Sequence, residues 1–371
     1  MTHNDDEPIK GQQLPPFAQP ERKRKAKEPK PRPSLHHSRK RVARPDEDII
    51  AALPEACANE TAAVEFIEMM RWGGTPVCPR CASPKVAQMK DASGKRSARY
   101  LWRCYECKAA KRAEQFTVRV GSVFEDSRLP MRVWTTAMWM TAKAKNGCSA
   151  LELSRATHRT HKTCLFVLHR LRWAMATDWS PEPKMEGNIV ADETYLGPKT
   201  RQRVHARRSR QGGNTTDWTK KRAVLAVINQ QTGEVRTRTV ERVTAKTLTM
   251  HLLETVDPRA SRLLTDKEPA YITTGRTFAL GHHRVDHSVK EYVRHDGDVC
   301  VTTNPCEAFF SRLKRALVGT FHSVSVKHAH RYASEFEFKS NTAKMSDGAR
   351  FTALVKRAVG KRLTYAEQIG A

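Results

Sequence analysis

The spacing of apolar positions changes near residue 180 and divides the chain into two regions. Before that point, apolar residues recur at the three- and four-residue steps of amphipathic helices, first between Ile49 and Met70 and again over most of residues 132–175. Beyond it, the segments NIVADETYLG, RAVLAVINQ and EVRTRTVERV are rich in Val and Ile and are joined by turns that contain Gly, a pattern typical of strands. We therefore predict a domain boundary near residue 180.

The strand-like segments continue into a helix and a further strand. TAKTLTMHLLETV has helical spacing and SRLLTD has the composition of a strand, so the predicted order is β-β-β-α-β-α. This is the order of the ribonuclease H-like fold, and it predicts an α/β domain over residues 181–345. The rest of the chain divides into a disordered basic arm (1–48), a short helix with a cysteine-rich ribbon (49–115), a helical region (116–180) and a C-terminal helical tail (346–371).

The charge of the chain points to a polyanionic partner. The sequence carries 66 Lys and Arg against 39 Asp and Glu, a formal net charge of +27, and eleven of the cations lie between Arg22 and Arg44. Such an excess attracts phosphate backbones, so nucleic acid is the leading candidate. The basic arm could add nonspecific DNA contacts or be a solvated tail. Apolar stretches are too short for a membrane span, and we expect a cytoplasmic, nucleoid-associated protein.

Four of the nine cysteines stand in two close pairs. CPRC supplies Cys78 and Cys81, and CYEC, 22 residues further on, supplies Cys104 and Cys107. Two such turns can bring four thiolates into the closed tetrahedron that structural zinc prefers. The alternatives are redox pairs or core cysteines, and iron in place of zinc stays open. The sequence therefore predicts a four-Cys zinc ribbon.

A helical hairpin between the ribbon and residue 180 has a basic face. In its second helix the residues Cys164, Val167, Leu168, Leu171 and Met175 form one apolar stripe. The opposite face is expected to present His161, Lys162, His169, Arg170 and Arg172. A helix-turn-helix would offer such a face to a DNA groove, whereas an ordinary amphipathic hairpin would leave it in solvent.

Three acids form the candidate catalytic site. Asp192 follows the apolar residues Ile189, Val190 and Ala191, and Asp266 follows a second apolar strand. A carboxylate at the end of a buried strand must be paired, hydrogen-bonded or bound to metal. Together with Glu307 on a predicted helix, these acids could hold two Mg²⁺ or Mn²⁺ ions for in-line phosphoryl transfer.

Two features beside these acids have alternative explanations. Asn304 and Glu307 frame a Pro at a predicted helix start, so they could form an N-terminal cap instead of binding metal. The loop after Asp192 holds nine Lys and Arg, including Arg207, Arg208 and Arg210. That loop could be solvated or could clamp DNA phosphates.

Eight blocks of sequence, in order, resemble insertion-sequence transposases of the DDE type that join an N-terminal zinc ribbon to an ISXO-type catalytic domain. The blocks are RWGGTPVCPRC, CYEC, FTVRVGSVFEDSRLPMRVW, ALELSRATHRTHKTCLFVLHRLRWAM, ADETYLG, LTDKEPAY, VDHSVKEYV and the segment that begins TNPCEAFFSRLKRALVG. They extend over about residues 60 to 342. The resemblance implies a ribonuclease H-like catalytic domain and metal-dependent cleavage and transfer of DNA strands at inverted terminal repeats.

The resemblance also implies roles for single residues. It makes Asp192 and Asp266 catalytic acids, and His287 and Lys314 auxiliaries of the same site. The third position is Asn304 or Glu307, and we favour Glu307 because it lies seven residues before Lys314. The side chains that we expect to contact DNA are Lys162, His169, Arg170, Arg172, Arg207, Arg208, Arg210, Lys314 and Arg315.

The expected partner is double-stranded DNA, both element ends and target, bound by a homo-oligomer. A competing hypothesis is a catalytically inert DNA-binding protein derived from a transposase. A sequence-nonspecific nuclease on the same fold is a third possibility. The presence of all candidate acids favours the transposase.

Overall fold

The computed structural model describes residues 47–177, 183–197 and 221–369, which lie within the compact unit Arg44–Ala371. All but the last two residues of the predicted basic arm lie outside the described residues. The loop that contains Arg207, Arg208 and Arg210 lies outside them as well. No helix in the described ranges is long and apolar enough to cross a membrane.

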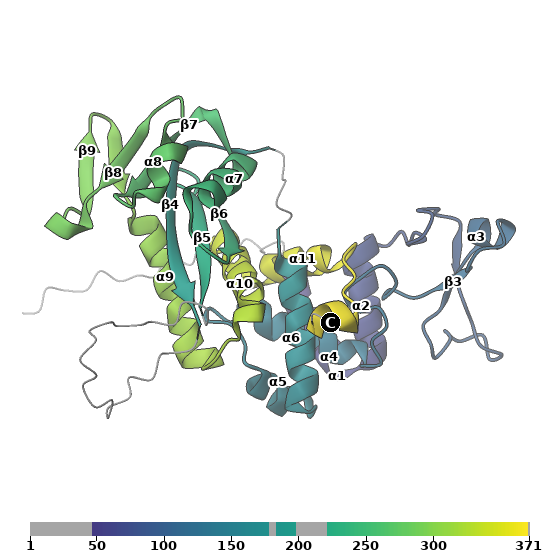
Figure 1. Cartoon of the computed structure of the whole chain (residues 1–371). Coiled ribbons are helices and arrows are strands. Elements are labelled where there is room, and N and C mark those ends of the chain that lie inside the picture. Colours follow the sequence, from purple (N-terminus) through teal and green to yellow (C-terminus); the bar gives the residue numbers. More distant parts are fainter. Residues whose placement is uncertain (1–46, 178–182, 198–220, 370–371) are drawn as a thin grey trace, which may run out of the picture. The chain divides into compact units, whose positions relative to one another are not determined.

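Seven helices from both ends of the described chain form a helical region (Figure 1). They are α1 (Glu47–Ala58), α2 (Glu60–Trp72), α4 (Met131–Lys143), α5 (Ala150–Thr157), α6 (His161–Met175), α11 (Asp347–Ala358) and α12 (Tyr365–Ile369). One apolar core joins α1, α2, α4, α5, α6 and α11 and includes Ile67, Trp134 and Phe351. Asn59 separates the first two helices, because its side chain accepts hydrogen bonds from the N–H groups of Thr61 and Ala62.

This core differs from the division expected from sequence at both ends. Residues 49–72 form two helices that pack on α4, where we expected a single helix grouped with the ribbon. The C-terminal residues are helical as expected, but α11 is no peripheral tail, since it packs on α2, α4 and α6. Phe351, Leu354 and Val355 give α11 an apolar face that is buried in this core.

The ribbon is a small antiparallel sheet. Its strands are β1 (Val86–Gln88), β2 (Trp102–Cys104) and β3 (Gln115–Phe116), in the order β1-β2-β3, and the short helix α3 (Tyr105–Ala109) follows β2. The ribbon has its own buried cluster of three cysteines and Phe116. A cluster this small cannot offset the chain entropy lost on folding, so the ribbon needs another source of stability.

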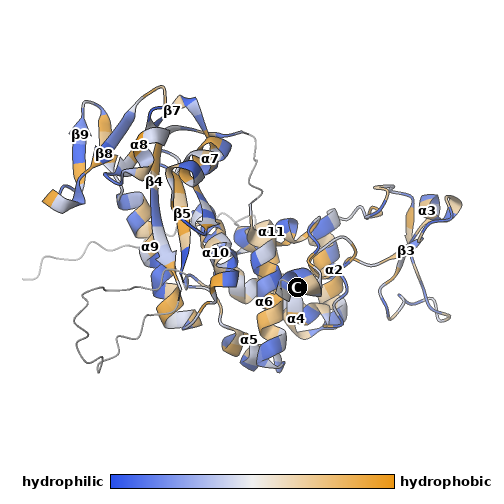
Figure 2. Cartoon of the chain, in the orientation of Figure 1, coloured by the Kyte–Doolittle hydropathy of each residue, from blue (hydrophilic) through white to orange (hydrophobic). Residues whose placement is uncertain are grey.

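The second half of the chain is a mixed α/β domain. Its elements are β4 (Met185–Leu196), β5 (Arg222–Asn229), β6 (Val235–Val240), α7 (Ala245–Thr255), β7 (Val256–Asp266), α8 (Ala270–Gly275) and β8 (His282–Val285). The sheet order is β6-β5-β4-β7-β8; β4, β5 and β6 are antiparallel, whereas β7 runs parallel to β4 and β8. The predicted element order is therefore confirmed. Buried β5 is almost wholly apolar (Figure 2).

The remaining elements extend and cover this sheet. They are η2 (His287–Val289), the hairpin β9 (Val293–Asp296) and β10 (Val299–Thr302), α9 (Asn304–Ala316), η3 (Leu317–Phe321), η4 (Val326–His328) and α10 (Ala329–Asn341). Helices α9 and α10 cover one face of the sheet, and α7 and α8 cover the other. The hairpin β9–β10 was not predicted from the sequence. Successive side chains of a strand point to opposite faces of the sheet, so the position of a residue along its strand decides which pair of helices its side chain faces.

Candidate metal centre and active site

The four ribbon cysteines converge as predicted. Their sulfur atoms all lie within 4.8 Å of one another, with Cys78 Sγ 3.8 Å from Cys107 Sγ and Cys81 Sγ 3.6 Å from Cys104 Sγ. Sulfurs at the corners of a tetrahedron around Zn²⁺ would be about 3.8 Å apart, given a Zn–S distance of about 2.3 Å. The ribbon thus has the donor set and the spacing of a structural zinc site, which would supply the stability that its small core lacks.

Asp192 and Asp266 lie on one face of the central sheet. The parallel strands β4 and β7 pair Ile189 with Leu263 and Val190 with Leu264, so each Asp stands two residues beyond the last pair. The alternation of side chains puts both carboxylates on the same face as Val190 and Leu264, which is the face under α9. Asp192 does not end its strand as we expected, because β4 continues to Leu196 alongside β5.

The first turn of α9 brings Glu307 over this face. Cys306 is fully buried, with its sulfur 3.7 Å from the carbonyl oxygens of both Val190 and Ala226. Ala226 is the β5 partner of Asp192, so α9 begins directly above that acid. Glu307, the next residue, is exposed and contributes to the negative potential at Asp192.

The electrostatics of Asp192 reflect this crowding. The pKa of Asp192 is raised to about 7, first by burial and then by the negative charges of Glu193, Asp266 and Glu307, against a backbone hydrogen bond that lowers it. Acids that raise one another's pKa are stabilised by a cation between them. Carboxylate oxygens are also the ligands that Mg²⁺ and Mn²⁺ take, so this donor set fits a divalent metal. In the described part of the chain, however, only the four cysteines form a tight ligand cluster.

His287 and Lys314 lie on either side of Glu307. His287 Nε2 is 2.9 Å from Thr303 Oγ1 and 3.5 Å from Glu307 Oε1, so it joins η2 to the start of α9. Lys314 is exposed two turns further along α9 and lines a cavity of about 510 Å³ with Tyr195 and Leu196 of β4. The adjacent Arg315 is exposed as well.

Asn304 does not cap the helix, so the alternative explanation for this residue is not supported. Helix α9 begins with Asn304 itself, its N-cap is Thr303, and no side chain forms a capping hydrogen bond there. Pro305 at the next position already lacks the N–H that a cap would bind, which lowers the need for one. Glu307 is therefore not engaged in a capping box.

Sequence reasoning missed Glu193 and Tyr271. Glu193 is half-buried on the face opposite Asp192, where its Oε2 accepts a hydrogen bond of 2.7 Å from the hydroxyl of fully buried Tyr271. The signal for Glu193 is its position directly after Asp192. A second acid in the same buried strand also needs a partner, which makes it a candidate site residue.

Three of the basic side chains expected on the exposed face of α6 are buried. Arg170 donates hydrogen bonds of 2.8 and 2.7 Å to the carbonyls of Val123 and Glu125, and Arg172 pairs with Glu335 of α10. His169 is buried as well. The expectation that these three face solvent is wrong, because other segments of the chain cover that side of the helix. His161 and Lys162, in the first turn, are exposed.

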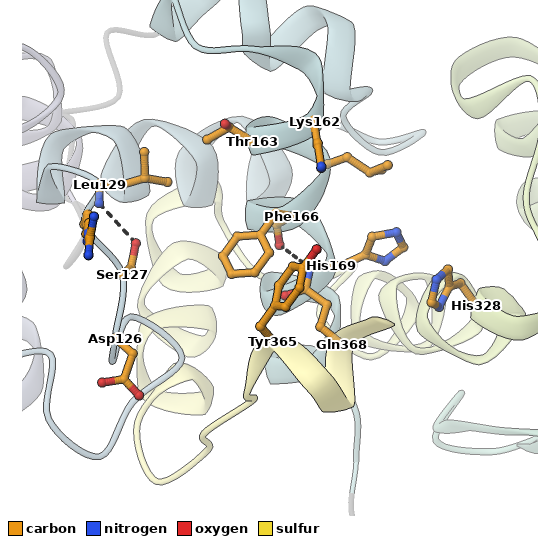
Figure 3. Close-up of a pocket in the computed structure, with 12 residues that line it drawn as sticks. Asp126, Ser127, Leu129, Lys162, Thr163, Phe166, His169, His328, Tyr365 and Gln368 are labelled. Atoms are coloured by element: carbon orange, nitrogen blue, oxygen red, sulfur yellow. Dashed lines mark hydrogen bonds between the residues drawn. The ribbon is translucent and has the colours of Figure 1, made fainter. Parts of the chain in front are cut away.

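A pocket of about 510 Å³ lies beside α6 (Figure 3). Phe166 and Tyr365 form part of its lining, with ring centroids 6.2 Å apart, and Lys162 and His169 lie along it. His169 packs on the ring of His328 at 4.7 Å between centroids, and burial lowers its pKa to about 2, so its ring is neutral. None of the candidate acids lines this pocket.

Two family models match the chain, one in each half. Residues 184–341 match the ISXO2-like transposase domain, and residues 58–110 match the transposase zinc-ribbon domain. The two matches, one over the sheet that carries the acids and one over the thiolate cluster, define the class as transposases. The chain therefore combines a transposase zinc-ribbon domain with an ISXO2-like transposase domain.

One curated relative is a protein of a transposable element. An uncharacterized protein in the transposable element ISH50 of Halobacterium salinarum is 28% identical over 287 residues, which cover 76% of this chain and 90% of that protein. Among solved structures, a chain of the simian T-cell lymphotropic virus intasome complex with PP2A regulatory subunit B56 gamma matches at 13% identity with a TM-score of 0.25. That match covers 52% of this chain and 65% of that one. A likeness of that size carries no argument.

Proposed function

We propose that the chain is an active DDE transposase with a ribonuclease H-like catalytic domain, which cleaves and joins DNA strands at the inverted repeats of its own element. The observation that carries the proposal is the meeting of Asp192, Asp266 and Glu307 over one face of the sheet, where their charges act on one another. The mixed sheet order supports the fold assignment. Zn²⁺ in the ribbon is the structural metal of the proposal.

Each side chain of the site has a separate task in this proposal. Asp192, Asp266 and Glu307 would hold Mg²⁺ or Mn²⁺, which activates the attacking oxygen and stabilises the leaving oxygen of phosphoryl transfer. His287 orients the Glu307 carboxylate through the 3.5 Å contact and is itself fixed by Thr303. Lys314 would bind a DNA phosphate near the acids, because its ammonium lies exposed on the same helix.

A strand-transfer assay on the terminal repeats that flank the gene tests the proposal. Wild-type protein with Mg²⁺ should join repeat-ended DNA to a target, and Asp192→Asn and Asp266→Asn should abolish joining while repeat binding persists. Glu186→Gln is the matched control, because Glu186 is an exposed acid on the same strand as Asp192. Joining by either Asp variant at the wild-type rate would contradict the assignment of the acids.

The same assay separates the competing functions. A catalytically inert DNA-binding protein would shift repeat DNA in a gel without cleaving it at any Mg²⁺ or Mn²⁺ concentration. A nonspecific nuclease would cut DNA with scrambled ends as fast as DNA with the repeats. Only preference for the repeats together with joined product supports the transposase.

A further inference from the structure

Each of the two strand acids is held by one backbone N–H group. Asp192 Oδ1 accepts a hydrogen bond of 2.8 Å from the N–H of Glu193, and Asp266 Oδ1 accepts one of 3.0 Å from the N–H of Glu268. These bonds fix each carboxylate relative to its own segment. They do not fix the distance between the two segments.

The backbone pairing of the sheet does not fix that distance either. Pairing between β4 and β7 ends at Val190 and Leu264, two residues before the acids. Beyond this point, a link between the segments is the hydrogen bond from the Tyr271 hydroxyl to Glu193 Oε2, at 2.7 Å. Tyr271 also donates its backbone N–H to the carbonyl of Glu268, at 3.1 Å.

The four bonds form a continuous chain from one acid to the other. It runs from Asp192 through Glu193, Tyr271 and Glu268 to Asp266. Tyr271 is fully buried in the core between the sheet and α7, so its ring cannot shift easily. Glu193 lies on the face opposite Asp192 and is therefore directed away from the face where metal and DNA would lie.

We propose that Glu193 is a positioning residue, which Tyr271 holds in place so that the carboxylates of Asp192 and Asp266 keep the separation that metal binding needs. The inference rests on the proposed function, because it assigns a role in the same site. Hydrogen-bond partners of metal ligands commonly change metal affinity ten- to a hundred-fold when they are removed. If Tyr271 and Glu193 only satisfied each other's hydrogen bonds in the core, removing one of them would not change metal affinity.

Tyr271→Phe removes the hydroxyl and keeps the ring in the core. In the full-length protein, the Mg²⁺ concentration for half-maximal strand transfer should rise about ten-fold or more, while the rate at saturating Mg²⁺ stays within about two-fold of wild type. Glu193→Gln should stay near wild type, because its amide oxygen still accepts the tyrosine hydrogen bond. Tyr332→Phe, which removes a hydroxyl from another buried tyrosine, is the control.

A double variant checks that the two side chains act as one unit. Glu193→Ala should raise the Mg²⁺ concentration for half-maximal strand transfer as much as Tyr271→Phe does, and the double variant should need no more Mg²⁺ than either single variant. The proposal is overturned if Tyr271→Phe has wild-type Mg²⁺ dependence, or if Glu193→Gln loses activity as completely as Asp192→Asn. The second result would make Glu193 a metal ligand itself.

Direct Mn²⁺ binding separates this proposal from the function on which it rests. Mn²⁺ bound by the full-length protein can be measured from the electron paramagnetic resonance signal of the free ion, without DNA. If the wild type binds Mn²⁺ but joins no DNA, the proposed function fails, whereas a weaker Mn²⁺ affinity of Tyr271→Phe still supports positioning. Equal Mn²⁺ affinities of wild type and Tyr271→Phe overturn the positioning role.

Discussion

Arg172 of α6 donates a hydrogen bond of 2.8 Å from its Nε atom to Glu335 Oε2 of α10, and both side chains are almost fully buried. The guanidinium lies over the rings of Tyr332 and Phe321, at 4.1 and 4.9 Å from their centroids. A second cation, Lys339, stands 3.7 Å from Glu335 Oε1. The pair therefore joins a helix of the helical region to a helix that covers the sheet of the transposase domain.

Breaking this pair should destabilise the protein strongly. Glu335→Ala would leave two buried cations without their acid, and such a loss costs about 3–5 kcal/mol. The expected result is a lower urea midpoint, followed by tryptophan fluorescence. Glu152→Ala, which removes an exposed acid from α5, should change the midpoint little. An unchanged midpoint for Glu335→Ala would show that the pair contributes nothing net.

The burial of Arg172 could not be predicted from the sequence. The helical spacing of α6 correctly gave its apolar stripe, and Cys164, Val167 and Leu168 are all buried. Spacing within one helix cannot show that a second helix, 163 residues away along the chain, supplies Glu335 as a buried partner. An arginine with a buried partner and an arginine in solvent look alike in sequence, so Arg172 was misplaced.

Features that depend on local sequence were predicted, whereas features that depend on tertiary contacts were not. The spacing within each Cys pair predicted the thiolate cluster, because a Cys-x-x-Cys turn fixes its own geometry. The apolar strand-like segments predicted the order of strands and helices along the transposase domain. The Glu193–Tyr271 bond and the packing of α11 depend on tertiary contacts, which no local pattern contains.

Removing zinc should unfold the ribbon and leave the helical core folded. The two have separate apolar clusters, and the ribbon cluster consists mainly of cysteines of the candidate zinc site. Cys104→Ser should lower bound zinc well below one ion per chain and make residues 78–116 sensitive to trypsin. Cys300→Ser, which changes a cysteine outside the cluster, should retain the metal. A full equivalent of zinc in Cys104→Ser would contradict a four-thiolate site.

The burial of Arg170 gives Lys162 and Arg170 different expected effects on DNA binding. Exposed Lys162 should contact phosphate if α6 approaches DNA, so Lys162→Ala should reduce the slope of log affinity against log salt by about one. Arg170→Ala should leave the slope unchanged and lower stability, because the carbonyls of Val123 and Glu125 lose their donor. Fluorescence anisotropy at several salt concentrations measures both slopes. Equal slopes for wild type and Lys162→Ala would show that Lys162 does not contact DNA phosphate.

The raised pKa of Asp192 should appear as a pH-dependent stability of the metal-free protein. The pKa is about 7 in the folded state and about 3.9 in the unfolded chain. Between these values the folded state binds more protons than the unfolded one, so stability falls as pH rises from about 4 to 7. Asp192→Asn lacks this loss and should be more stable than wild type above pH 7, by up to about 4 kcal/mol.

Thermal melts in chelator from pH 4 to 8 measure this difference. It should be small near pH 4 and reach its full size above pH 7, whereas Glu186→Gln on the same strand should follow the wild type throughout. A stability gain of Asp192→Asn that is the same at every pH would point to packing rather than ionisation.

The contacts at the start of α9 favour Glu307 over Asn304 as the third acid of the proposed site. Glu307 acts on the potential at Asp192 and contacts His287, whereas Asn304 neither caps the helix nor has such a contact among the described residues. Glu307→Gln keeps the size of the side chain and removes its charge, so strand transfer should fall at least about a hundred-fold. Asn304→Ala should leave the rate within about three-fold and the melting temperature nearly unchanged, because no cap is lost.

The two variants must be compared at equal DNA occupancy, with strand transfer measured over a range of Mn²⁺ concentrations. Excess Mn²⁺ should restore part of the activity of Glu307→Gln if the lost carboxylate was a metal ligand, because mass action offsets weaker binding. His287→Ala should give an intermediate loss, since it removes the residue that orients Glu307 but leaves the ligand. Loss of activity in Asn304→Ala, with Glu307→Gln active, would reverse the assignment.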